Sequence, residues 1–137
     1  MNGAVFVDTS AFLAIKNRRD ARHREAVRLK GQLLAAGKSL VTSDYVLDET
    51  YTIIRLRAGH RVAVEFGEEL RVSRLIRIEY VTAALTESAW ALFKRFADKD
   101  FSFTDCTSFV MMRELGLREA LAFDGHFPQA GFVEVRL

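Results

Sequence analysis

The chain has 137 residues, half of them apolar, with 8 Gly and a single Pro, which predicts one globular domain over residues 1–137 and argues against disorder or a long linker. Its one cysteine excludes an internal disulfide framework, no apolar run is long enough to span a bilayer, and the N-terminal apolar run lacks the basic leader of a signal peptide, so we expect a soluble cytoplasmic protein without a membrane partner. The net charge is only +2, but 15 of the 20 basic residues are Arg, which is compatible with a phosphate-bearing partner and equally with a GC-rich genome.

The first predicted element is a short apolar run, Ala4–Val7, typical of a strand buried on both faces. The carboxylate of Asp8 follows directly, and the hydroxyl residues Thr9 and Ser10 then begin a helix that should end near Lys16. Ligands of an open parallel sheet bind outside the carboxyl ends of its strands, where Asp8 would lie. For a lone Asp at this position, a simple helix cap is the favoured interpretation. Its role therefore depends on whether other carboxylates reach the same place.

The second predicted helix begins at an N-cap Asp20 and runs to about Gly37, with Val27 among its inner residues. Its first half and the preceding turn are strongly basic, containing Arg18, Arg19, Arg22, His23, Arg24 and Arg28. These side chains most simply form a solvated face. A basic rim beside a cleft would also help to hold a polyanion.

A short strand, Ser39–Thr42, leads into a helix from Tyr45 to about Arg57 that Ser43 or Asp44 would begin. This helix contains two adjacent acids, which its periodicity separates. Glu49 shares an apolar stripe with Val46, Ile53 and Leu56, whereas Asp48 shares a polar face with Asp44, Thr52 and Arg55. We therefore expect Glu49 to point inward and Asp48 toward water. An inward carboxylate needs a partner, either an arginine or a metal ion.

The middle of the chain predicts a helix over His60–Val72, a strand over Leu75–Val81 and a further helix with Thr86 as its N-cap. Trp90 and Phe93 in that last helix are expected to belong to the core rather than to a surface on which bases stack.

Two further acids occupy the last third of the chain. Asp105 stands three residues after Ser102, which is the spacing of a capping box, at the start of a helix that runs to Leu115. The apolar run Ala120–Phe123 leads into Asp124, which alone would be an ordinary turn residue. The alternating tail Phe132–Leu137 predicts a final edge strand. The histidines are scattered and Cys106 has no second thiol nearby, which argues against a zinc site.

This alternation of strands and helices predicts an α/β fold, a three-layer sandwich with a mostly parallel central sheet. Asp8 and Asp124 then lie at strand ends, and Glu49 and Asp105 lie near helix starts, all at the same edge of the sheet. Four clustered carboxylates would repel one another unless cations neutralise them. Hard divalent ions with oxygen ligands, such as Mg²⁺ or Mn²⁺, would do so.

Four segments of the chain resemble the acidic motifs of PIN-domain ribonucleases: Val7-Asp8-Thr9-Ser10, Glu49 in its helix, Ser102-Phe103-Thr104-Asp105-Cys106 and Phe123-Asp124-Gly125-His126-Phe127. The length is similar to that of the VapC-type toxins of toxin–antitoxin pairs. One departure is Ala122, where family members often carry Ser or Thr. This change removes a hydroxyl that would support Asp124.

The resemblance implies that Asp8, Glu49, Asp105 and Asp124 hold one or two Mg²⁺ or Mn²⁺ ions that activate water for hydrolysis of RNA. Asp8 and Asp105 would be direct ligands, while Glu49 and Asp124 could act through waters. Thr9, Ser10 and Thr104 could orient a carboxylate or a phosphate oxygen.

The resemblance also implies two protein partners, a cognate VapB-like antitoxin and a second copy of the chain in a homodimer. Two alternatives stay open from the sequence. One is a non-catalytic or housekeeping PIN-like RNA-binding module. The other is a receiver-like signalling domain, although the paired acids after the first strand and the late lysine of such domains are missing.

Overall fold

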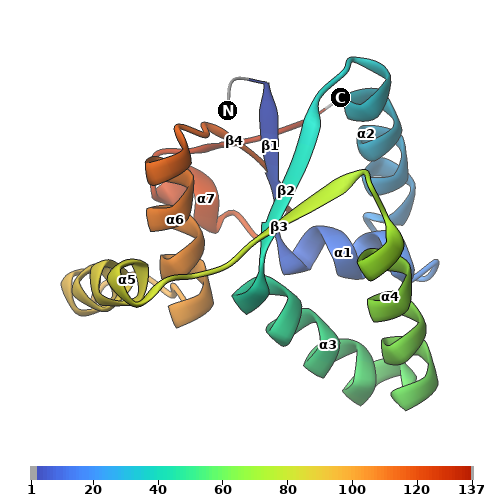
Figure 1. The fold of residues 1–137 in the computed structure, drawn as a ribbon, viewed down its shortest axis with the longest axis horizontal. Coiled ribbons are helices and arrows are strands. Elements are labelled where there is room, and N and C mark those ends of the chain that lie inside the picture. The colour runs from blue at the N-terminus through green and yellow to red at the C-terminus, as the bar shows by residue number, and fades with distance from the viewer. Residues whose placement is uncertain (1–2, 137) are drawn as a thin grey trace.

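A computed structural model describes residues 3–136 and contains one parallel sheet (Figure 1). The strands follow the spatial order β3-β2-β1-β4-β5, and every neighbouring pair is parallel. Their bounds are β1 Ala4–Val7, β2 Ser39–Ser43, β3 Ile76–Glu79, β4 Glu119–Leu121 and β5 Val133–Glu134. The predicted α/β fold with a parallel central sheet is confirmed.

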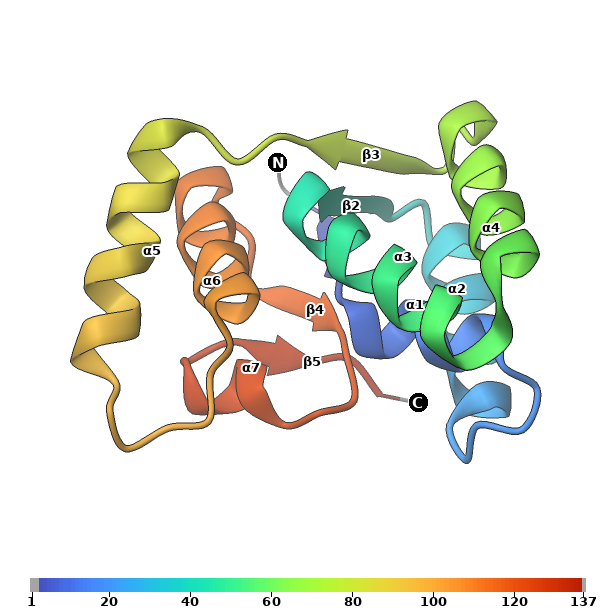
Figure 2. The same ribbon diagram turned by 90° about the horizontal axis from the view of Figure 1, so that it is seen from below.

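Seven helices flank this sheet: α1 Thr9–Lys16, α2 His23–Ala35, α3 Asp44–Ala58, α4 His60–Val72, α5 Ala83–Arg95, α6 Phe103–Leu115 and α7 His126–Gln129. Figures 1 and 2 show α1 to α4 on one side of the strands and α5 to α7 on the other. Within residues 3–136, none of these helices has the length and apolar character needed to cross a membrane.

The central strand β1 is fully buried, as its apolar sequence predicts, and it carries the first acid. Val5 pairs with Leu40 of β2 on one side and with Glu119 of β4 on the other. Because all strands run in the same direction, their carboxyl ends lie at one edge of the sheet. Asp8 therefore emerges at the middle of that edge, between the chain segments that follow β2 and β4.

The start of α2 differs from the prediction. Asp20 does not cap this helix, because its Oδ1 accepts a hydrogen bond from the backbone N–H of Arg22 at 2.8 Å and so closes a local turn. The helix begins three residues later, at His23. Val27 is 45% exposed and does not belong to the inner face.

The start of α5 also differs from the prediction. Thr82 is its N-cap, and the Thr82 side chain accepts a hydrogen bond from the backbone N–H of Leu85. Thr86 instead lies within the helix, where its hydroxyl donates to the Thr82 carbonyl at 3.1 Å. Both residues are threonines followed by helix-forming sequence, so local chemistry alone did not distinguish them.

Two aromatic residues of α5 lie on the surface, contrary to their predicted place in the core. Trp90 is 49% exposed and Phe93 is 40% exposed. This helix packs on α6 at the outside of the molecule, so only one of its faces is covered (Figure 2). The two rings contact Phe103, which in turn contacts Tyr45. We call these four residues the aromatic surface cluster.

The strands at the two edges of the sheet are shorter than predicted. β3 covers only Ile76–Glu79, and the final strand, β5, covers only Val133–Glu134. Leu137, the last residue of the predicted final strand, lies outside the described residues. The edge position predicted for this strand is confirmed, because β5 pairs with β4 alone.

Candidate active site

Asp8 follows β1, caps α1 and lies at the carboxyl edge of the sheet. Its side chain caps α1, accepting hydrogen bonds at Oδ2 from the backbone N–H of Ser10 at 3.2 Å and from the Ser10 hydroxyl at 2.8 Å. The carboxylate is nevertheless only 2% exposed at the edge of the sheet. Ser10 also accepts a hydrogen bond from the backbone N–H of Phe123 at 3.0 Å. Ser10 thus joins the Asp8 carboxylate to the segment that carries Asp124.

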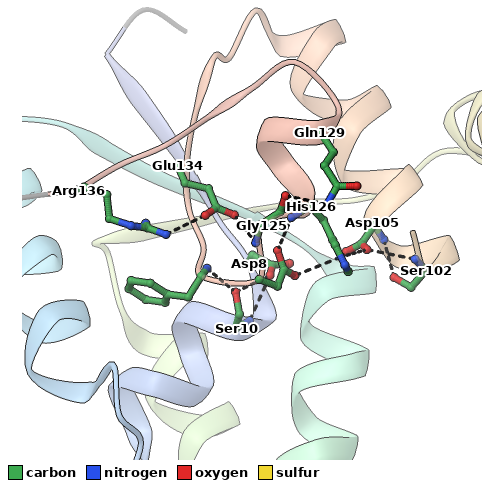
Figure 3. Close-up of polar contacts among 11 residues, drawn as sticks. Asp8, Ser10, Ser102, Asp105, Gly125, His126, Gln129, Glu134 and Arg136 are labelled. Atoms are coloured by element: carbon green, nitrogen blue, oxygen red, sulfur yellow. Dashed lines mark hydrogen bonds and ion pairs between the residues drawn. The ribbon is translucent and has the colours of Figure 1, made fainter. Parts of the chain in front are cut away.

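Asp105 lies in the first turn of α6 and forms the predicted capping box with Ser102. The Ser102 hydroxyl accepts from the backbone N–H of Asp105 at 2.9 Å, and the Asp105 Oδ2 accepts from the backbone N–H of Ser102 at 3.1 Å. Asp105 is buried, and Figure 3 shows its side chain turned toward those of Asp8 and His126. Capping therefore fixes the carboxylate without turning it away from the site.

Asp124 and His126 belong to the segment between β4 and β5. The Asp124 Oδ1 accepts from the backbone N–H of His126 at 3.0 Å, which is the local turn expected of an Asp at this position. The imidazole of His126 points back toward the acids. Its Nδ1 lies 2.8 Å from the Asp105 Oδ2 and 3.5 Å from the Asp124 Oδ2.

Asp105, Asp124 and His126 form a compact group of possible metal ligands. One side-chain oxygen or nitrogen from each of the three lies within 4.8 Å of the others. The two carboxylates are the oxygen donors that Mg²⁺ and Mn²⁺ prefer, and the imidazole adds a nitrogen donor in its neutral form. Asp8 faces the same space but lies outside this group.

Glu49 lies at the border of the buried face of α3 rather than within that face. The buried residues of α3 are Val46, Leu47, Thr50 and Ile54. Leu56, predicted on the same stripe as Glu49, is 80% exposed, so the assigned stripe is wrong by part of a turn. Asp48 faces water, as predicted, and Glu49 is half-buried. No basic side chain among residues 3–136 forms an ion pair with Glu49.

Threonines surround Glu49. Burial raises the pKa of its carboxyl group, the hydroxyls of Thr9 and Thr104 partly offset this effect, and the nearby charges of Asp105 and Asp124 raise the pKa further. Thr9 is itself held in place, since its hydroxyl oxygen lies 3.0 Å from that of the buried Thr50. Glu49 therefore belongs to the same electrostatic site as the aspartates.

Burial and mutual repulsion raise the pKa values of acids at this site, and the nearby imidazole of His126 offsets the effect on Asp105 only in part. Burial, reinforced by the charge of Asp124, raises the pKa of Asp8 to about 7. Burial likewise raises the pKa of Asp105. For His126, burial alone would lower the pKa, but the charges of Asp124 and Asp105 outweigh burial and raise it. A divalent cation would relieve this repulsion, so the residues present fit a metal ion.

His126 is the side chain at this site that sequence reasoning did not select. It was visible two residues after Asp124, but histidines were discounted because they are scattered along the chain. The hydrophobic pattern of the sequence does not show that the short helix α7 turns the His126 ring toward Asp105. Glu134 and Arg136, which contact the Asp124 segment, were equally unmarked in the sequence.

The fold and the candidate site together point to one class of protein. They combine a parallel sheet, flanked by helices, with acids from four separate segments at its carboxyl edge. The family model of the PIN domain matches residues 5–133. The chain therefore belongs to the PIN-domain family. This membership leaves the receiver-like alternative without support.

The chain is similar over nearly its whole length to VapC-type toxins. It is 46% identical over 132 residues to the 23S rRNA-specific endonuclease VapC20 of Mycobacterium tuberculosis, covering 96% of this chain and 98% of that protein. A VapC ribonuclease of Archaeoglobus fulgidus is 29% identical over 127 residues, which cover 90% of this chain and 79% of that protein.

Solved structures agree with this relationship. The crystal structure of M. tuberculosis VapC20, described as a sarcin–ricin loop cleaving toxin, superposes with a TM-score of 0.87 at 47% identity, covering 97% of this chain and 99% of that one. VapBC2 of Rickettsia felis, bound to a DNA fragment from its promoter, matches with a TM-score of 0.71, covering 96% of this chain and 97% of that one. At 12% identity this second match supports the fold alone.

Proposed function

We propose that this protein is a metal-dependent endoribonuclease that hydrolyses RNA phosphodiester bonds as the toxin of a toxin–antitoxin pair. The observation that carries the proposal is the convergence of Asp8, Glu49, Asp105 and Asp124 at one edge of the sheet. It occurs in a chain 46% identical to a 23S rRNA-specific endonuclease, so the proposed substrate is 23S rRNA.

Asp105, Asp124 and His126 would hold the cation, Mg²⁺ or Mn²⁺, with Asp8 facing it from the end of β1. When bound, the cation supplies positive charge beside the scissile phosphate and a coordinated water of lowered pKa. The protein contributes rigidity. Ser10 fixes the Asp8 carboxylate, and Ser102 fixes that of Asp105. Thr9 and Thr104 place Glu49 at the margin of the same space, where it can orient a water molecule.

One residue of the Arg-rich segment before α2, Arg22, lies near the chain segment that carries Asp124. The guanidinium of Arg22 is 5.7 Å from the centre of the Phe123 ring, next in sequence to Asp124. Arg22 pairs with Glu25 at 2.8 Å in the free protein. A phosphate of the RNA backbone could take the place of that carboxylate, because a guanidinium can bind phosphate through two parallel hydrogen bonds.

The proposal is tested by incubating purified protein with 23S rRNA and Mn²⁺ and mapping new RNA ends. Asp8→Asn and Asp105→Asn should each lower cleavage by roughly 100-fold or more, because each removes a negative charge that binds or faces the cation. Circular dichroism should report an unchanged fold for both. EDTA should abolish cleavage by the wild type.

Asp48→Asn is the matched control, since it removes one exposed carboxylate of α3 outside the site and should cleave like the wild type. Cleavage by Asp8→Asn at the wild-type rate would contradict the assigned site. RNA binding without cleavage would favour a non-catalytic module. Cleavage of other RNAs at a similar rate would favour a housekeeping nuclease.

Two protein partners belong to the proposal. The relationship to VapC-type toxins supports a cognate VapB-like antitoxin. A homodimer is supported by the aromatic surface cluster, because large exposed rings on a single protomer commonly mark a contact surface.

A further inference from the structure

The segment that carries Asp124 and His126 is held from outside the site by two residues at the end of the described chain. Figure 3 shows Glu134 and Arg136 reaching toward it from β5 and the residues that follow. The Glu134 Oε2 accepts a hydrogen bond from the backbone N–H of Gly125 at 3.0 Å. The Glu134 Oε1 accepts from the Arg136 Nη2 at 2.8 Å. We call this pair the C-terminal clasp.

Arg136 contacts the same segment on the other side of Asp124. Its Nη1 donates to the Ala122 carbonyl at 2.9 Å and to its neighbour, the Val135 carbonyl, at 2.7 Å. Its guanidinium carbon also lies 4.9 Å from the centre of the Phe123 ring. The clasp thus holds the backbone before Asp124 through the Ala122 carbonyl and the backbone after it through the Gly125 amide.

The clasp is a polar network built around a buried carboxylate, with the Arg136 side chain 36% exposed at the surface. The Glu134 side chain is only 7% exposed, and both of its oxygens accept hydrogen bonds. Charge-assisted hydrogen bonds with buried partners are stronger and more directional than exposed ones. The network can therefore restrict a backbone segment that has little regular structure of its own.

The segment needs this restraint because it has few local supports of its own and carries two possible metal ligands. Ala122 has no hydroxyl with which to support Asp124, and Gly125 adopts a left-handed conformation with a φ of 79°. Yet Asp124 and His126 supply two of the three groups of the compact metal-ligand set. A small displacement of this backbone would move both away from Asp105 together.

We propose that Glu134 and Arg136 are positioning residues that hold Asp124 and His126 in metal-binding geometry. The proposal rests on the metal site of the proposed function, but it concerns residues outside that site. If the pair served only to attach the edge strand, its loss would lower stability and leave the metal affinity of the folded protein unchanged. The two roles are therefore separable.

The test is the affinity of purified protein for Mn²⁺ without RNA, followed by electron paramagnetic resonance of the free ion. Glu134→Ala and Arg136→Met should each weaken Mn²⁺ binding roughly 10- to 100-fold, the usual effect of removing a group that orients a ligand. Glu134→Gln retains an oxygen that can accept from Gly125 and should recover much of the loss. Arg118→Met, at an exposed arginine just before β4, is the control and should bind Mn²⁺ like the wild type.

RNA cleavage by the clasp variants should be low at limiting Mn²⁺ and rise toward the wild-type rate when the ion is in excess. Unchanged Mn²⁺ affinity in both Glu134→Ala and Arg136→Met would overturn the proposal, as would a wild type that binds no Mn²⁺. If either variant fails to fold, Arg136→Gln is compared with the wild type, because glutamine cannot keep the hydrogen bonds of Arg136 to both Glu134 and the Ala122 carbonyl. Equal Mn²⁺ affinity in these two proteins then counts against the clasp. Mn²⁺ binding that depends on the clasp in a protein that cleaves no RNA would support the clasp and contradict only the proposed function.

Discussion

At the scale of single residues, Asp8 shows how one side chain serves the fold and the site together. Its oxygen caps α1 through Ser10, while its burial at the end of β1 raises its pKa to about 7. A cap on a surface helix would stay ionised and stabilise the fold. Here burial disfavours the charge more than the cap favours it, so in the absence of a cation Asp8 is partly protonated at neutral pH.

This pKa predicts an unusual pH dependence of stability in EDTA. The folded protein binds a proton at Asp8 that the unfolded chain, with an ordinary pKa of 3.8, releases earlier. The free energy of unfolding should therefore fall as the pH rises from about 4 to about 7, by at most about 4 kcal/mol. The raised pKa values of Glu49, Asp105 and His126 act in the same direction.

Urea denaturation across that pH range would measure the effect. Asp8→Asn should flatten the profile and be more stable than the wild type near neutral pH, while Asp48→Asn should keep the wild-type slope. A wild-type profile that rises across the range would contradict the assignment. Saturating Mg²⁺ should reverse the loss, because the cation binds the ionised form.

At the scale of elements, α3 shows what periodicity can and cannot predict. The stripe that contained Glu49 was assigned from apolar residues alone and included Leu56, which is exposed. The buried face instead includes Thr50, a polar residue that a hydrophobic pattern omits because its hydroxyl is satisfied within the helix by the Val46 carbonyl at 2.7 Å. Glu49 therefore lies one residue from the buried face, close enough to reach the site.

The two neighbouring acids of α3 give a direct comparison. Glu49→Gln should lower RNA cleavage by about tenfold or more, since the Glu49 carboxylate is close enough to Asp105 and Asp124 to interact with their charges. Asp48→Asn should have little effect, because Asp48 faces water. Initial rates of 23S rRNA cleavage at saturating Mn²⁺ would measure both. Equal losses in the two variants would show that Glu49 is not part of the site.

At the scale of the whole molecule, the fold follows from the sequence because apolar runs and breaks alternate clearly along the chain. Those runs identified the strands β1, β2 and β4 and placed four acids at one sheet edge. Of the possible metal ligands at the site, only the four acids could be predicted, because each of them lies near the end of a predicted strand or the start of a predicted helix. His126 and the clasp could not be predicted, because their contacts depend on how α7 and β5 turn after Asp124.

The outer position of α5 has a consequence for assembly. Trp90 and Phe93 leave a partly exposed aromatic surface that a second copy of the chain could cover. Sedimentation of the purified protein should show a dimer, and Trp90→Ser should shift it toward the monomer. Leu56→Ser, which alters an exposed apolar side chain of α3, should leave the dimer intact. A wild type that stays monomeric at high concentration would contradict the homodimer.

The pairing of β1 with β4 also determines when activity can arise during synthesis. The Ser10 hydroxyl accepts its hydrogen bond from Phe123, 113 residues later, and the acids that act on Asp8 lie at the start of α6 and after β4. A nascent chain therefore cannot assemble the acids until the segment after β4 has left the ribosome. If the substrate is ribosomal RNA, this order of events would keep each incomplete chain harmless to the ribosome that is translating it.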